Sequence, residues 1–265
     1  MKNNSLFAVT KYPDGQISVK VYSPIDKLII RITSYEDVFI LKSIADIHHH
    51  NGWILPNVFI PCLFGQQSDK RFCEKESFDL KNIAEVINSC CFKHVNIFDP
   101  HSDVSLALIN NSVVVSPLSN IRAAVYDIEI KSRETLVDAG NILLVSPDAG
   151  AYKKVFKIAQ VLDNQLVPAN KYRDREGNIS LEVSGNVKGL QCLICDDICV
   201  GGATFIQLGK KLKELGANKV FLYVSHGHFT KGFDELKQYI DHIYCTNSVK
   251  DIVKENSFLT QYKVI

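Results

Sequence analysis

Two adjacent acidic residues stand where an apolar run gives way to a glycine-rich turn. The run is Gln191–Cys195, the acids are Asp196 and Asp197, and the turn Val-Gly-Gly-Ala leads into a segment of helical spacing that opens at Thr204. Paired carboxylates can accept hydrogen bonds from neighbouring sugar hydroxyls. Small residues let backbone N–H groups approach a phosphate, and a helix amino end favours that anion. The pattern predicts a sugar-phosphate site, although an acidic strand end before an ordinary glycine turn would give the same pattern.

Further turns elsewhere in the chain also carry polar groups that could bind a ligand. Residues 146–150 read Ser-Pro-Asp-Ala-Gly, and residues 99–103 read Asp-Pro-His-Ser-Asp. Residues 12–15 read Tyr-Pro-Asp-Gly, and residues 225–227 read Ser-His-Gly. Most of these turns follow an apolar run, so we expect them at strand ends.

The elements that must position these turns alternate along the chain. We expect strands at 18–22, 57–61, 94–98, 142–146, 191–195 and 219–224. We expect helices at 34–48, 79–89, 119–128, 153–162 and 204–215. Such alternation is typical of parallel sheets built by right-handed crossovers. Open sheets of this kind bind ligands at the carboxyl ends of their strands.

The pattern runs twice, which predicts two similar α/β domains. We place them at residues 1–117 and 118–265, with no low-complexity linker between them. Residues 174–186 are mostly polar and contain two glycines, so we expect a mobile loop there.

Composition indicates an ordinary soluble protein of the cytoplasm. Net charge is +1, which gives no support for binding to nucleic acid or to a membrane. The longest apolar stretch, residues 53–64, is interrupted by two prolines, and no signal peptide is recognisable. We expect the eight cysteines to be reduced core residues. The pair Cys192 and Cys195 leaves a zinc or redox site open.

Taken together, the motifs resemble those of the ribose-phosphate diphosphokinase family, also called phosphoribosyl-pyrophosphate synthetases. The matching segments, in the family's order, are 12–16, 60–70, 99–101, 146–150, 171–173, 196–204 and 225–227. The resemblance covers nearly the whole chain. It implies an α/β fold of two tandem type I phosphoribosyltransferase-like domains, each a mostly parallel sheet flanked by helices.

The resemblance also implies roles for individual residues. His101 and Asp148 would hold a Mg²⁺ ion that bridges ATP phosphates, and Lys171 and Arg173, at the start of a catalytic loop spanning about 171–186, would stabilise charge on the transferring group. The sugar phosphate would be bound by Asp196, Asp197, Gly201, Gly202, Ala203 and Thr204. ATP would be bound in the N-terminal domain by Tyr12, Asp14, Gln16, Gln67, Ser68 and Asp69.

The reaction implied is pyrophosphoryl transfer. The 1-hydroxyl of a ribose 5-phosphate unit would attack the β-phosphorus of ATP and AMP would leave, with no protein nucleophile needed. Family resemblance also implies a homo-oligomer, from dimer to hexamer.

The chain departs from the family pattern in two places. Gln16 replaces a glutamate, and the pair Gln67-Ser68 replaces Arg-Gln, which weakens the expected contacts with ATP. Val200 and Gly201 replace an Asp-Thr pair, so the turn loses a hydroxyl donor and gains room. We therefore slightly favour an acceptor capped at its 5-phosphate, ADP-ribose, giving a donor for NAD resynthesis, over free ribose 5-phosphate.

Other interpretations stay open at this point. The chain could be a phosphoribosyltransferase, although that activity needs only one such domain, or a catalytically weak regulatory homologue. The three histidines at 48–50 could form a metal tract, but their spacing favours a helix carboxyl end. His226 could lie near the site or hold a structural turn.

Overall fold

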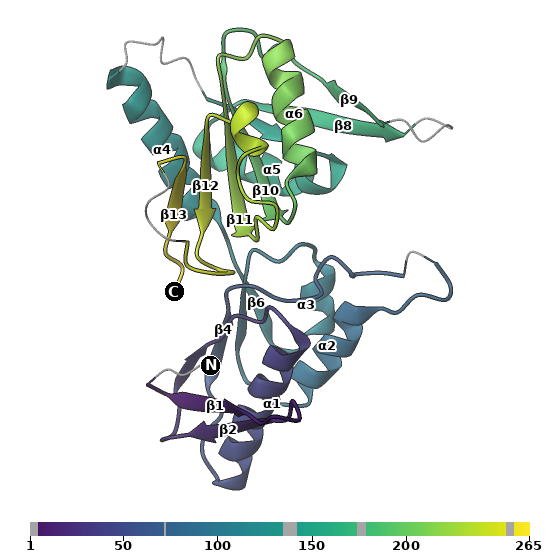
Figure 1. The fold of residues 1–265 in the computed structure, drawn as a ribbon, viewed down its shortest axis with the longest axis vertical. Helices are drawn as coiled ribbons and strands as arrows, with labels where there is room; N and C mark the ends of the chain where they lie inside the picture. Colours follow the sequence, from purple (N-terminus) through teal and green to yellow (C-terminus); the bar gives the residue numbers. More distant parts are fainter. Residues whose placement is uncertain (1–4, 72, 135–141, 174–178, 253–256) are drawn as a thin grey trace. The chain divides into compact units, whose positions relative to one another are not determined.

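The chain divides into two compact units in a computed structural model, which describes residues 5–71, 73–134, 142–173, 179–252 and 257–265. One unit comprises Met1–Ser116 with Ile265, and the other comprises Pro117–Val264 (Figure 1). No helix among these residues is long and apolar enough to cross a membrane.

A hairpin and a four-stranded parallel sheet make up the N-terminal unit. Strands β1 (Phe7–Lys11) and β2 (Ile17–Val21) pair antiparallel. The sheet has the order β3-β4-β5-β6, and its strands span Lys27–Ile29, Asn57–Ile60, Val95–Phe98 and Ser112–Val115. The helices between them are α1 (Tyr35–His50), α2 (Asp79–Asn88) and α3 (Val104–Leu108).

Because these four strands follow one another in sequence order, right-handed crossovers place the connecting helices on one face of the sheet. The core of the unit lies there, where α1 and α2 pack buried aliphatic side chains against strand residues such as Val58 and Ile97. Register aligns Ile29, Phe59, Asn96 and Val113 across the other face. Of these, Ile29 is 46% exposed and Val113 is 55% exposed, so this face is not fully covered within the chain.

The C-terminal unit is a seven-stranded sheet flanked by helices, with the strand order β13-β12-β11-β10-β7-β8-β9. The strands are β7 (Leu143–Ser146), β8 (Leu166–Arg173), β9 (Ile179–Val183), β10 (Gln191–Cys199), β11 (Lys219–Gly227), β12 (His242–Thr246) and β13 (Leu259–Tyr262). The helices are α4 (Leu118–Glu134), α5 (Ala149–Leu162), α6 (Ala203–Glu214) and the short 3₁₀ helix η1 (Leu236–Gln238). All neighbouring strands run parallel except β8 and β9.

Strands β7 and β10 are neighbours at the point where the chain reverses its direction across this sheet. From β7 the chain moves outward to β8, and from β10 it moves the other way to β11, β12 and β13. Such a reversal leaves a crevice outside the carboxyl ends of the two strands, which is where open α/β sheets bind ligands. The topology therefore predicts a site beyond the ends of β7 and β10.

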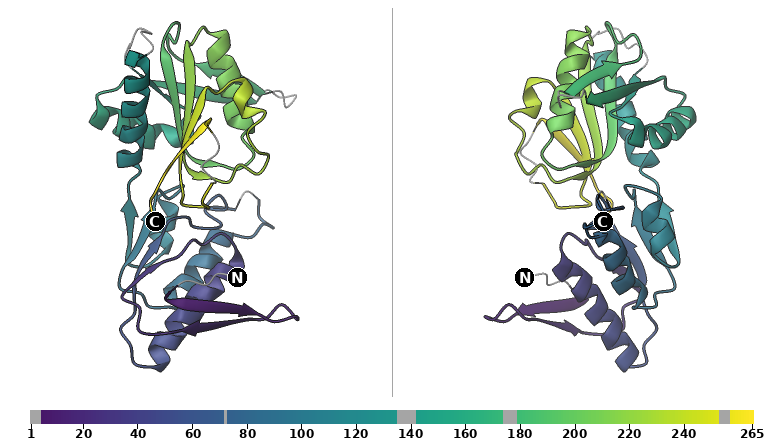
Figure 2. Two further views of the ribbon diagram at one scale, coloured as in Figure 1. Left: turned by 60° about the vertical axis from the view of Figure 1, so that its left-hand side comes forward. Right: turned by 90° about the vertical axis from the view of Figure 1, so that its right-hand side faces the viewer.

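Successive side chains of β10 pack into the two hydrophobic cores on opposite faces of the C-terminal sheet. Cys192 and Ile194 pack with α6, whereas Leu193 and Cys195 pack with α4 and α5 on the opposite face. Figure 2 shows α6 on one side of the sheet and α4 on the other. Because the C-x-x-C cysteines face opposite layers, they cannot share a metal ion or a disulfide within one chain. All eight cysteines are free.

Several elements differ from the sequence expectation. Strand β10 continues to Cys199, so the acid pair lies inside a strand rather than in the turn after it, because Ile198 and Cys199 still pair with β11. Residues Ile179–Val183 form a strand paired with β8 instead of a loop, and the rest of the predicted loop, 174–178, lies outside the described residues. Helix α1 ends at His50, as the three histidines predicted.

Candidate functional site

The acid pair lies near the carboxyl end of β10. Asp197 is only 5% exposed, whereas Asp196 is partly exposed. The backbone N–H of Asp197 donates to Oδ1 of Asp196 over 2.9 Å. Successive strand residues normally point to opposite faces. This local hydrogen bonding brings the two carboxyl groups together at one place instead.

Burial raises the pKa of Asp196 well above its ordinary value, and the charges of Asp197 and Asp148 raise it further. Two carboxyl groups in contact resist ionising together, so one retains its proton to higher pH. A pair with one proton can both donate and accept hydrogen bonds. That is the combination that two neighbouring sugar hydroxyls can match.

Asp148 follows β7, the strand beside β10. Its Oδ1 accepts a hydrogen bond from the backbone N–H of Ala151 over 2.9 Å, which makes it the side-chain cap of α5. The hydroxyl of Ser146 donates to the backbone carbonyl of Asp148 over 2.7 Å and fixes the turn. The remaining carboxylate oxygen of this exposed side chain is left for an external ligand. Thus the carboxyl ends of β7 and β10 together present three acids.

The glycine turn connects β10 to α6. Gly202 has a φ of +83°, a left-handed conformation that favours glycine, and it caps the helix without a side-chain hydrogen bond. A Cβ at this position would lie 3.3 Å from Leu236, so the turn is also tightly packed. Ala203 and Thr204 begin α6, whose first N–H groups have no intrahelical acceptor. This end of α6 is therefore suited to an anion.

Hydrogen bonds to the loop after β12 hold the buried His226 at the end of β11. Its Nδ1 lies 2.9 Å from the hydroxyl of Ser248, which also donates to the carbonyl of Ser225 over 2.8 Å. Thr246 donates to the same carbonyl over 2.7 Å. The described contacts of His226 thus indicate a structural role. Thr246 and Ser248 were not foreseen, although the polar run Thr-Asn-Ser at 246–248 marks a strand end.

In the N-terminal unit, two predicted segments meet at the carboxyl ends of β4 and β5. The backbone N–H of His101 donates to Oε1 of Gln66 over 3.1 Å, and Gln66 is 3% exposed. Gln67, Ser68 and Asp69 continue this loop. The structure therefore brings the predicted ATP loop next to His101, through Gln66, a residue that the sequence did not single out.

Tyr12, Asp14 and Gln16 lie at the tip of the β1–β2 hairpin, and all three are exposed. The N–H of Tyr12 donates to the carbonyl of Gln16 over 2.8 Å, and the N–H of Gln16 donates to Oδ1 of Asp14 over 3.0 Å. These bonds hold the tip together and leave its side chains facing outward.

The comparisons with known proteins agree with this geometry. Residues 116–264, more than half of the chain, match the phosphoribosyl transferase domain. The chain belongs to the phosphoribosyl transferase domain family. A ribose-phosphate pyrophosphokinase from Pyrococcus furiosus is 25% identical over 260 residues, which is 96% of this chain and 89% of that protein. Another from Cereibacter sphaeroides is 29% identical over 229 residues, which is 83% of this chain and 66% of that protein.

A solved structure extends the likeness to the whole fold. The phosphoribosylpyrophosphate synthetase from Mycobacterium smegmatis superposes with a TM-score of 0.81 over 97% of this chain and 86% of its own, at 18% identity. The predicted α/β fold and the predicted resemblance to the ribose-phosphate diphosphokinases are therefore confirmed, and with them the expectation of a transferase.

The two predicted catalytic cations of this family member lie in β8. Lys171 pairs with Leu181 and Arg173 pairs with Ile179 in the antiparallel ladder with β9. Residues 174–178, which follow Arg173 in the sequence, lie outside the described residues. The roles of Lys171 and Arg173 stay predictions.

The donor set of the C-terminal unit fits Mg²⁺ as a partner of bound phosphates. Among the described residues, no three histidine, cysteine or acidic side chains are grouped so that they could hold a metal ion by themselves. Mg²⁺ is commonly held by one or two carboxylates together with substrate phosphates and water. The uncommitted oxygen of Asp148 is suited to that arrangement.

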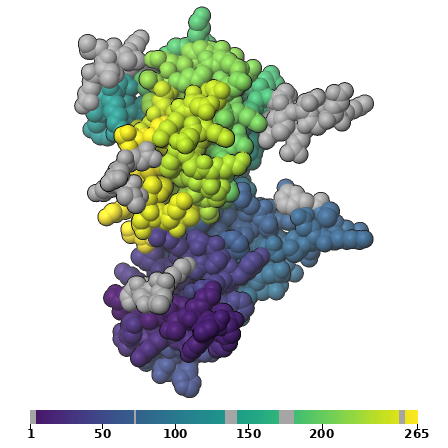
Figure 3. Space-filling model, viewed as in Figure 1, coloured from purple at the N-terminus to yellow at the C-terminus, as the bar shows by residue number. Residues whose placement is uncertain are grey.

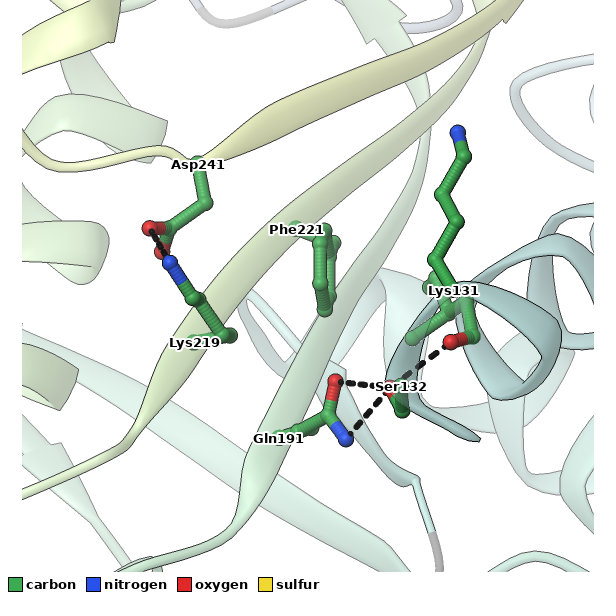
Figure 4. A pocket seen from close by; sticks show the side chains of 7 residues that line it. Lys131, Ser132, Gln191, Lys219, Phe221 and Asp241 are labelled. Carbon is green, nitrogen blue, oxygen red and sulfur yellow. Dashed lines mark hydrogen bonds and ion pairs between the residues drawn. The ribbon is translucent and has the colours of Figure 1, made fainter. Parts of the chain in front are cut away.

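A separate cavity of about 210 Å³ lies at the opposite end of the same sheet (Figure 4). It is lined by Ile128, Lys131, Ser132, Gln191, Lys219, Phe221 and Asp241. Gln191 and Lys219 begin β10 and β11, whereas the acid pair lies near the end of β10. In Figure 4, Gln191 and Ser132 bond to each other and Lys219 to Asp241, so these groups are already paired. The cavity does not belong to the candidate site.

Proposed function

We propose that this chain transfers the β,γ-diphosphate of ATP to the 1-hydroxyl of ribose 5-phosphate and releases AMP. The observation that carries the proposal is the convergence of Asp148, Asp196 and Asp197 at the point where the sheet order reverses, beside the amino end of α6. The names of the relatives, ribose-phosphate pyrophosphokinases, support the same reaction.

Each part of the C-terminal site has a role in this proposal. Asp196 and Asp197 hold the 2- and 3-hydroxyls of the ribose, with one carboxyl group donating and the other accepting. The backbone N–H groups of 201–204 receive the 5-phosphate. Held in this way, the sugar presents its 1-hydroxyl in a fixed direction, and positioning supplies much of the rate enhancement.

The transfer needs no protein nucleophile, because the substrates themselves supply the bond that forms and the bond that breaks. The 1-hydroxyl oxygen forms a bond to the β-phosphorus, the bond from that phosphorus to the oxygen shared with the α-phosphate breaks, and the hydroxyl proton leaves to solvent. AMP departs with the α-phosphate. Lys171 and Arg173 are proposed to stabilise the charge that builds on the transferred oxygens.

The ATP side is proposed to lie in the N-terminal unit. Tyr12, Asp14, Gln16 and the loop Gln67–Asp69 are assigned to ATP, and His101 and Asp148 to a Mg²⁺ ion on its phosphates. When bound, that ion neutralises phosphate charge and orients the chain of phosphates. The hydrogen bond from His101 to Gln66 supports a fixed position for this turn.

A second acceptor, ADP-ribose, is favoured by one feature of the glycine turn. Val200 is 40% exposed and Gly201 has no side chain, so the turn offers an apolar surface and no hydroxyl where the family pattern has Asp-Thr. A capped 5-phosphate carries less charge and more apolar surface than a free one. On this hypothesis the product would serve NAD resynthesis.

A row of apolar residues on the N-terminal sheet supports a homo-oligomer. Ile29, Phe59 and Val113 align on one face, where Ile29 and Val113 are exposed and Phe59 is partly exposed. Light scattering coupled to gel filtration tests this part, and a monomer at micromolar concentration would reject it.

An AMP assay tests the proposed reaction. The protein is incubated with ATP, Mg²⁺ and either ribose 5-phosphate or ADP-ribose, and AMP is quantified. We expect AMP in proportion to ribose 5-phosphate consumed, and its loss in the Asp197→Asn variant. No AMP with either sugar, or consumption of a sugar 1-diphosphate together with a free base instead, would reject the proposal.

A further inference from the structure

The segment that follows β11 is fastened to the glycine turn. The N–H groups of His228 and Phe229 donate to the carbonyl of Cys199 over 2.9 and 3.3 Å. The N–H and the hydroxyl of Thr230 both donate to the carbonyl of Val200, over 2.9 and 3.1 Å. Four hydrogen bonds thus join residues 228–230 to the start of the turn.

Lys231 follows this segment, and its side chain lies across Gly201. A Cβ at Gly201 would be 3.6 Å from Cε of Lys231 and 3.7 Å from its Cδ. These are ordinary van der Waals separations, so the methylene stem of the lysine occupies the space beside the glycine that appeared open in the sequence. The stem also brings the ammonium group to the edge of the turn.

The backbone around Lys231 is held in one conformation. Phe229 has a φ of +47°, although its ring is buried and only 6% exposed. That ring covers Gly227, where any Cβ would collide with it. Gly232, on the other side of the lysine, has a φ of +72°. A residue between two left-handed positions, one of them anchored by a buried ring, has a defined place relative to the turn.

Lys231 is exposed, and among the described residues its ammonium group makes no ion pair or hydrogen bond. Four other lysines of this unit do form ion pairs: Lys213 and Lys219 with Asp241, Lys131 with Asp127, and Lys237 with Asp234. Lys250 donates to the carbonyl of His228 over 2.6 Å, so the same segment carries a second positive charge. The border of the glycine turn is therefore cationic. Figure 3 shows that segments from α6 onward, coloured green to yellow, form much of this face of the unit.

We propose that Lys231 binds the 5-phosphate of the acceptor and makes the site select a phosphomonoester. This inference rests on the proposed function and adds a residue to it. The turn has lost the hydroxyl of the family's Asp-Thr pair at Val200 and Gly201. A charge-assisted hydrogen bond from the ammonium group compensates for that donor.

The proposal also predicts which acceptor is preferred. A free 5-phosphate has two negative charges, whereas the same phosphate in ADP-ribose is esterified and has fewer. The lysine stem fills the room beside Gly201 that a larger acceptor would need. Lys231 therefore favours ribose 5-phosphate over the capped sugar.

Calorimetric titration of ribose 5-phosphate into the whole chain, without ATP, tests the assignment independently of turnover. Lys231→Met keeps the length of the stem and removes the charge, and we expect its Kd to rise at least about tenfold, the usual scale for a charged hydrogen bond. Lys231→Arg should retain binding within about threefold, because it keeps the charge. Lys210→Met, an exposed change further along α6, is the matched control and should bind like wild type.

The outcomes separate the two proposals. Equal Kd values for wild type and Lys231→Met, or no binding by either, overturn the role of Lys231. If wild type binds ribose 5-phosphate through Lys231 but forms no AMP, the proposed function fails and the phosphate site stands. In the AMP assay, Lys231→Met should raise the KM for ribose 5-phosphate and leave the KM for ATP unchanged.

Discussion

The buried side-chain amide of Gln66 accepts a hydrogen bond from the backbone N–H of His101, with 3.1 Å between Oε1 and N. This bond joins the loop after β4 to the turn after β5. Gln66 directly precedes the segment Gln67–Asp69 assigned to ATP, in which Gln67 is exposed and the other two residues are partly buried. Asp99, at the start of the same turn, has a φ of +41°, so the turn has a conformation that needs support.

We therefore predict that Gln66→Met, which keeps the length of the side chain and removes the acceptor, raises the KM for ATP about tenfold and lowers the free energy of unfolding by about 1 kcal/mol. The KM for ribose 5-phosphate should not change. Gln66→Glu keeps an acceptor oxygen and should restore much of the ATP affinity. Steady-state kinetics with each substrate varied in turn provide the check, and an unchanged KM for ATP in Gln66→Met would contradict the positioning role.

Replacing one acid of the pair should make the protein more stable and less active. Asp196→Asn should raise the free energy of unfolding near neutral pH by about 1 kcal/mol or more, because it removes a charge that burial and two acids disfavour. The same variant should lose most AMP formation, because the amide leaves one acceptor oxygen where the carboxyl group has two, and its donor can no longer move between the two side chains.

The pH dependence of this effect follows from the raised pKa of Asp196. Below the unfolded pKa, near 3.8, the residue is protonated in both states and the variant should match wild type. As pH rises through the folded pKa, wild type loses stability relative to the variant. Urea denaturation at several pH values measures the difference, and a constant difference across that range would contradict the account.

The contribution of Asp241 to the free energy of unfolding should depend on pH in the opposite direction to that of Asp196. Burial alone would raise its pKa, but bonds from Lys213, Lys219 and the N–H of Val220 lower it below the ordinary value. Its stabilising effect is present above pH 3.8 and lost as pH falls through the folded pKa. Asp241→Asn should cost about 1 to 2 kcal/mol at pH 7 and progressively less in acid.

The control for this change is Asp234→Asn, since Asp234 is fully exposed and lies 3.8 Å from Lys237. It should leave the free energy of unfolding unchanged within experimental error, because a fully exposed ion pair is screened by solvent. Equal effects of the two substitutions at pH 7 would show that the Asp241 cluster adds nothing to stability.

Helix α4 is attached to the sheet by a hydrogen bond of 2.7 Å from the hydroxyl of the buried Tyr244 to Asp127. Burial tends to raise the pKa of Asp127, but hydrogen bonds from Lys131 and Tyr244 lower it overall. Tyr244→Phe should lower the free energy of unfolding by about 1.5 to 3 kcal/mol, since the bond is to a charged group. Tyr126→Phe, on the same helix and 64% exposed, should have little effect. Thermal unfolding of both variants decides whether the bond contributes.

Periodicity and turn chemistry predicted the parts of the fold that local sequence specifies. The apolar runs gave β4, β5, β7 and β10, and the amphipathic segments gave the five longer helices. Strands β4, β5 and β7 are each one residue shorter than predicted, whereas β10 extends four residues beyond its apolar run. Strand β10 continues through Asp196 and Asp197 since β11 still hydrogen-bonds to it.

The sequence could not show which residues tertiary contacts would bring to the site. Gln66 and Gln67 are adjacent residues of the same type. Gln66 is buried and hydrogen-bonded to the backbone of His101, whereas Gln67 is exposed. Nothing in the sequence distinguishes Lys231 from the other lysines, and only the contact of its methylene stem with Gly201 does so. Only the reversal of strand order between β7 and β10 explains why Asp148 and Asp196 lie near each other.

The most direct test of the central claim is the ³¹P NMR spectrum of the products formed from ATP, Mg²⁺ and ribose 5-phosphate. We predict equal amounts of AMP and of a ribose 5-phosphate that carries a diphosphate on carbon 1, and neither product with Asp197→Asn. Formation of ADP with a sugar monophosphate at carbon 1, or an unchanged spectrum from the wild-type protein, would contradict the account.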